Sequence, residues 1–150
     1  MGRLERPALQ LTVAAASLVP ISAGAAGILL GLHLVNGIIA APADLDSHYR
    51  YLSGLLLGIG LGFASTIPHI EMRGRRFRLL AGIVMLGGVG RLMSLLWIGS
   101  PSPAMLAALV MELIVTPGLA LWQYRVTIGA RQLGSARPTP RERIGATDDT

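Results

Sequence analysis

Four long apolar runs decide what this 150-residue chain can fold into. Each run holds roughly the 20 residues that a helix needs to cross the hydrocarbon core of a bilayer. Only 14% of the residues are charged, whereas soluble domains carry about 25%. The sequence therefore predicts an all-α integral membrane protein, a four-transmembrane-helix bundle formed by residues 1–125. The expected spans are 9–31, 52–70, 77–98 and 104–124.

The arginines predict how this bundle lies in the membrane. All 13 basic residues are arginine, and 11 of them precede the first run, separate the second from the third, or follow the fourth. Because cytoplasmic loops are enriched in basic residues, we expect a multi-pass protein with both termini in the cytoplasm. Attraction to anionic lipid accounts for these arginines, so no nucleic-acid partner is expected. The 11 residues are Arg3, Arg6, Arg73, Arg75, Arg76, Arg78, Arg125, Arg131, Arg137, Arg141 and Arg143.

The ends of the chain leave several alternatives open. The N-terminal segment has the basic and apolar parts of a secretory signal, but its apolar run continues to Ala41, so we expect it to stay uncleaved. This run is longer than one span, and it can tilt, kink at Pro20, or leave the bilayer near Gly31 and place 33–41 along the interface. Residues 126–150 are polar and arginine-rich, and we expect a disordered cytoplasmic tail there.

Two charges lie inside apolar runs, where a single charge is costly. Arg91 belongs to the third run and Glu112 to the fourth, and a short turn at 99–103 joins the two runs into a hairpin. Both residues lie about 12–14 Å from this turn at helical rise. We therefore expect Arg91 and Glu112 to form an intramembrane ion pair.

This pair has two compatible interpretations. A buried bridge can lock the third helix to the fourth, because removing one partner strands the other charge. Intramembrane ionisable residues also mark ligand and proton pathways. Arg91 and Glu112 are therefore candidate ligand-binding residues as well as structural ones.

A second polar cluster precedes the second run, in LDSHYRYLSG at residues 45–54. Asp46 or Ser47 can cap the second helix while the tyrosines and arginine anchor it at the headgroups. The alternative is that Asp46, His48 and Arg50 form a lid over the Arg91–Glu112 pair, joined by His33 and Asn36 if the first helix runs straight. Polar groups that converge in an apolar cavity are typical of a small-molecule site.

Three glycines of the second run, Gly54, Gly58 and Gly62, are spaced four apart and share one helix face. Small residues allow helix backbones to approach closely in lipid. This face therefore predicts helix packing within the monomer, or alternatively a homodimer contact. Gly60 lies off the face.

The chain has no cysteine, so disulfides and thiolate metal sites are excluded. Two facing histidines at one depth would be needed for a haem, but His69 lies at the opposite end from His33 and His48. No metal-ligand spacing, nucleophile elbow or phosphate loop is present either. We expect no metal and no cofactor.

Several segments together resemble a known family: LDSHYRYLSG at 45–54, GGVGRL at 87–92, PSP at 101–103, and EL at 112–113 followed by Pro117. They are similar to the small bacterial membrane proteins grouped as domain of unknown function 4345, over roughly residues 9–124. The resemblance implies a four-helix inner-membrane protein and no particular activity. The residues that carry over are Asp46, His48, Arg50, Arg91 and Glu112; the arginine-rich tail is outside it.

The function expected from these observations is non-enzymatic binding of a small amphipathic or anionic ligand, or service as an accessory subunit. Arg91 would contact the anion, Glu112 would orient Arg91 as its partner, and Asp46, His48 and Arg50 would form the lid. One alternative is a membrane-embedded enzyme acting on lipid or quinone, with Glu112 and His48 transferring protons. Another is a purely structural protein whose glycine face recruits a partner helix or a second copy.

Overall fold

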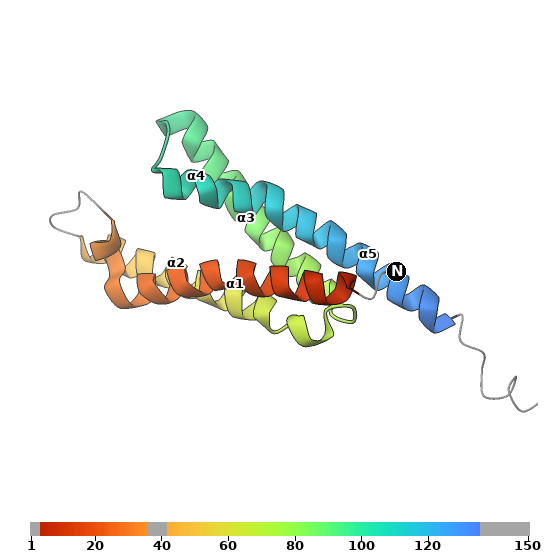
Figure 1. The fold of residues 1–150 in the computed structure, drawn as a ribbon. Helices are drawn as coiled ribbons and strands as arrows, with labels where there is room; N and C mark the ends of the chain where they lie inside the picture. Colours follow the sequence, from red (N-terminus) through yellow and green to blue (C-terminus); the bar gives the residue numbers. More distant parts are fainter. Residues whose placement is uncertain (1–3, 36–41, 136–150) are drawn as a thin grey trace, which may run out of the picture.

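The computed structural model describes residues 4–35 and 42–135, and every regular element in them is a helix (Figure 1). Long apolar runs in lipid can satisfy their backbone groups only within helices or closed barrels, and here they are helices. The main helices are α1 Glu5–Leu30, α2 Ala43–Ala64, α3 Gly74–Ile98 and α5 Thr116–Ser135. The shorter elements are η1 Gly31–Leu34, η2 Ile67–His69, α4 Pro103–Val110 and η3 Met111–Val115.

Four segments built from these elements are long and apolar enough to cross a membrane, as the sequence predicts. They are Glu5–Leu34, Ala43–His69, Gly74–Ile98 and Pro103–Gly129. The second segment begins well before residue 52, because the polar stretch that follows Pro42 is also helical. Capping of α2 by Asp46 or Ser47 was thus a wrong prediction: Pro42 occupies the N-cap, and both residues lie inside the helix.

Helix α1, which the first run forms, ends at Gly31. This glycine has φ 56° and ψ −142° and terminates α1; such a positive φ is readily accessible only to glycine. The turn η1 follows, with His33 exposed. Asn36 and most of the segment expected along the interface lie outside the described residues.

The expected boundary of the disordered tail at residue 125 was placed too early. Helix α5 continues to Ser135, and both Val126 and Thr127 are buried. The Thr127 hydroxyl donates a hydrogen bond of 3.2 Å to the Glu71 carbonyl. The start of the predicted tail is therefore a helix that is held by tertiary contacts, whereas residues 136–150 lie outside the described part.

Helices α1 and α2 pack closely as a hairpin, and glycines set their separation. A Cβ added at Gly24 would lie 2.6 Å from the Leu57 nitrogen, and one at Gly60 would lie 2.7 Å from Ile21 Cγ1. Real Cβ atoms do not approach so closely, so larger residues at either position would force the helices apart.

The packing predicted for Gly54, Gly58 and Gly62 is largely wrong for the described residues. A Cβ at Gly58 would meet nothing within 4 Å, and one at Gly54 would touch only Ile28 Cδ1 at 4.0 Å. Gly62 alone is close to a neighbour, Leu80 of α3, at 3.1 Å. The crossing uses Gly60 instead because the α1 residues Pro20 and Ile21 lie against that face.

All four membrane-length segments converge at one end of the bundle, where the fully buried apolar residues lie. These residues are Leu9, Val13, Ile70, Phe77 and Val126. The turn between α2 and α3 is tied down there by three polar contacts: Gln10 donates to the Ile67 carbonyl at 2.7 Å, Gln123 to the Ile70 carbonyl at 2.8 Å, and Arg6 pairs with Glu71 at 3.1 Å.

At the opposite end the molecule divides. The α1–α2 hairpin and the hairpin formed by α3 and α4 point in different directions, so their tips lie apart (Figure 1). The core that holds the four segments together is therefore at the end near the N-terminus and the α2–α3 turn.

Candidate functional site

The ion pair expected between the third and fourth runs is present. Arg91 of α3 donates from Nε to Glu112 Oε2 at 3.0 Å and from Nη2 to Oε1 at 3.2 Å. Two parallel hydrogen bonds of this kind are the strongest geometry for an arginine and a carboxylate. They fix the register of α3 against η3, which carries Glu112.

Gly88, one turn before Arg91, makes this geometry possible. A Cβ at Gly88 would lie 2.9 Å from Glu112 Cβ and 2.8 Å from Leu113 Cδ2. The absence of a side chain lets η3 lie directly on α3. The short distance between α3 and η3 then allows the Arg91 guanidinium to reach the Glu112 carboxylate.

Glu112 lies in a π-helical turn, Met111–Val115, which the sequence analysis missed. Pro117 has no N–H, and its ring would clash with the carbonyl four residues earlier, so a regular α-helix is disfavoured there. The Thr116 backbone N–H and hydroxyl instead both donate to the Met111 carbonyl, the hydroxyl at 2.8 Å. The signal was the Thr-Pro dipeptide four and five residues after Glu112. π turns inside α-helices occur frequently at functional sites.

The pair is only partly covered. The side chain of Arg91 is 35% exposed and that of Glu112 is 18% exposed. The remaining Arg91 nitrogen, Nη1, lies 2.8 Å from the Met105 sulfur of α4, which is a weak acceptor. Arg91 thus keeps N–H donors that no oxygen in the described residues satisfies.

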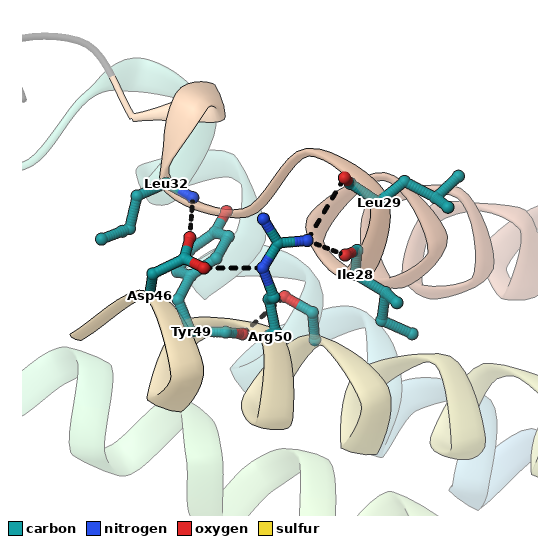
Figure 2. Close-up of polar contacts among 7 residues, drawn as sticks. Ile28, Leu29, Leu32, Asp46, Tyr49 and Arg50 are labelled. Carbon is teal, nitrogen blue, oxygen red and sulfur yellow. Dashed lines mark hydrogen bonds and ion pairs between the residues drawn. The ribbon is translucent and has the colours of Figure 1, made fainter. Parts of the chain in front are cut away.

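Polar side chains of α2 form hydrogen bonds with the backbone at the end of α1 (Figure 2). Asp46 accepts a hydrogen bond from the Leu32 backbone N–H at 2.9 Å and one from Arg50 Nε at 2.7 Å. Arg50 Nη1 in turn donates to the carbonyls of Ile28 and Leu29. The last carbonyls of a helix have no partner within the helix, so Asp46 and Arg50 cap α1 from the neighbouring helix.

The structure therefore separates the five candidate residues into two groups. Asp46 and Arg50 contact each other and α1, whereas Arg91 and Glu112 contact each other across the other hairpin. His48 is exposed, and its ring lies 6.4 Å from that of Tyr51. No contact in the described residues joins the first group or His48 to the Arg91–Glu112 pair, since the hairpins diverge. The described residues also contain no group of three or more His, Asp or Glu that could hold a metal ion.

The chain matches the model of one protein family, Domain of unknown function (DUF4345), over residues 8–123. It therefore belongs to this family, as its LDSHYRYLSG and GGVGRL segments indicate. No curated protein and no solved structure matched the chain.

Proposed function

We propose that this family member is an integral protein of the bacterial inner membrane that binds a small amphipathic or anionic molecule without transforming it. In this proposal Arg91 contacts the polar group of the ligand, and Glu112 orients the guanidinium. Both termini face the cytoplasm, in keeping with the arginines that flank the spans.

The observation that carries the proposal is the unsatisfied donor capacity of Arg91. Its guanidinium has five N–H groups, of which Glu112 takes two and the Met105 sulfur approaches a third nitrogen. Within a bilayer no bulk water is present, so each unsatisfied donor costs several kcal/mol. An oxygen acceptor at this position would remove that cost.

The chemistry of the pair limits the ligand. Arg91 and Glu112 together are neutral, so the site does not attract an anion by net charge. It offers oriented N–H donors next to apolar helix faces instead. Molecules with a carbonyl, ester, carboxylic acid or phosphate group on an apolar body fit these donors.

In this proposal Asp46, Arg50 and His48 do not contact the ligand's polar group but lie at the entrance to the site. Asp46 and Arg50 fasten the end of α1 and so fix the α1–α2 hairpin beside which the ligand enters. His48, which is exposed, belongs to the same entrance in the proposal.

The experiment is native mass spectrometry of the protein purified in mild detergent. We expect a co-purifying molecule in the wild type that is lost in Arg91→Ala and kept in Arg125→Ala, which removes an exposed arginine from α5. Because Arg91→Ala strands Glu112, the double variant Arg91→Met with Glu112→Leu is measured beside it. Retention of the molecule by both Arg91 variants would refute the proposal.

An accessory-subunit role is the second candidate, and one observation favours it. In the most apolar part of Pro103–Gly129 no residue is fully buried within the chain, so the face of this segment that does not pack on α3 is open to lipid or to a partner protein. A partner membrane protein that co-purifies with the wild type would support this role. The enzyme alternative needs Glu112 and His48 to act together, and it predicts turnover that Glu112→Gln abolishes in a folded protein.

A further inference from the structure

A hollow that does not include the Arg91–Glu112 pair lies between α3 and α5. Its volume is about 470 Å³, within the range of about 300–1,000 Å³ that is typical of small-molecule sites. Its lining includes the small residues Ala81, Gly82 and Ala120, together with Met85 and Pro117. We call it the α3–α5 groove.

The groove is apolar along its length and charged at one end. Arg78 and Tyr124 line that end, and the Arg78 guanidinium carbon lies 5.9 Å from the centroid of the Tyr124 ring. Because α3 and α5 are antiparallel, Met85 and Pro117 lie together about 10 Å further along. The groove therefore has the polarity of an amphiphile, with a cationic mouth and an apolar interior.

The surroundings of the mouth are also basic. Arg75 and Arg76, in the first turn of α3, are exposed. Together with Arg73 they line a neighbouring hollow of about 510 Å³, beside the exposed side chains of Met72 and Leu79. The acid closest in sequence, Glu71, is already paired with Arg6. Arginine and tyrosine are typical of the level at which lipid headgroups lie.

We propose that the α3–α5 groove binds one anionic phospholipid, with its phosphate at Arg78 and an acyl chain over Gly82. The positive charge of Arg78 favours an anionic headgroup, and the apolar lining of the groove favours an acyl chain. A free phosphate ion would interact only with the arginines and not with the apolar lining, so it would bind far more weakly than the intact lipid. This site does not include Arg91, which lies more than three helical turns beyond Arg78, the residue proposed to hold the phosphate, along α3.

Gly82 provides a sharp test, because a Cβ at this position meets nothing within 4 Å. Gly82→Leu adds an apolar side chain at this open position in the lining of the groove. Gly90→Leu is the matched control, since Gly90 lies on the same helix, outside the groove, and has equally open space. Arg78→Gln removes the charge at the mouth and leaves the groove open.

The protein is equilibrated with equal amounts of phosphatidylglycerol and phosphatidylcholine, and bound lipid is counted by native mass spectrometry. We expect one retained phosphatidylglycerol in the wild type and in Gly90→Leu, and its loss in Gly82→Leu. Arg78→Gln should lower the preference for phosphatidylglycerol about fivefold, as removal of one basic residue near a lipid surface would. Glycerol phosphate, which has the headgroup chemistry without acyl chains, should not compete at equal concentration.

Three results would overturn the proposal. The first is equal retention of the two lipids by the wild type, a measurement that needs no variant to fold. The second is unchanged phosphatidylglycerol in Gly82→Leu. The third is competition by glycerol phosphate, which would assign the site to small anions. The molecule that co-purifies through Arg91 should be unaffected by Gly82→Leu, so failure here and failure of the proposed function are distinguishable.

Discussion

At the scale of single residues, the pairing of Arg91 with Glu112 can be tested by exchanging the charges. We expect Arg91→Glu and Glu112→Arg each to lower the stability of the folded protein by about 3–5 kcal/mol, because each creates a stranded charge beside a like charge. The double exchange should recover part of this loss. The measurement is the thermal unfolding midpoint in detergent, followed by circular dichroism.

A double exchange no more stable than either single variant would show that the two residues do not stabilise the fold as a pair. Full recovery is not expected, because arginine and glutamate differ in length and Gly88 fits Glu112 in its present place. The longer arginine in the π turn would have to reach back toward a shorter glutamate on α3.

At the scale of helices, two glycines of α2 give opposite predictions for the same substitution. Gly60→Leu should destabilise the protein by about 1–3 kcal/mol, because the new side chain would overlap Ile21 and Pro20 of α1. Gly58→Leu should change stability little, or raise it slightly through better helix propensity. Unfolding midpoints of the two variants, measured side by side, check this difference.

The same pair of variants tests the homodimer alternative for the Gly54, Gly58 and Gly62 face. A second copy docked on this face would meet the new side chain of Gly58→Leu. If Gly58→Leu dissociates an oligomer or costs as much stability as Gly60→Leu, then this glycine face does pack against protein. Size-exclusion chromatography with light scattering gives the oligomeric state.

At the scale of the whole molecule, the sequence predicts the helices better than their arrangement. Length and hydropathy predict four segments long enough to cross a membrane, and equal depth below one turn predicts that Arg91 meets Glu112. Neither property indicates which face of α2 packs against α1. The regular spacing of Gly54, Gly58 and Gly62 was therefore taken as the packing face, and the contact at Gly60 was not predicted. The hydrogen-bond partners of Asp46 and Arg50 could not be predicted from the sequence either, because they are backbone groups at the end of α1 and carry no sequence signature.

The divergence of the two hairpins makes a further prediction at this scale. Spin labels at Leu45 and Ser100, near the two tips, should give a broad distribution of distances in a pulsed electron paramagnetic resonance experiment. Labels at Leu4 and Met72, at the buried end, should give a narrow one, because Arg6 and Glu71 hold that end together. The absence of native cysteine makes site-specific labelling direct. Equally narrow distributions at both ends would contradict the prediction.

The position of the buried core at one end has a mechanical consequence. Leu9, Ile70, Phe77 and Val126 join the two hairpins at that end, so each hairpin extends from this pivot as an arm. Small rearrangements at the pivot translate into larger displacements at the tips, since each arm is about 30 Å long. The Arg91–Glu112 pair joins the two helices of one arm, so a change in the angle between the arms would carry the pair with that arm.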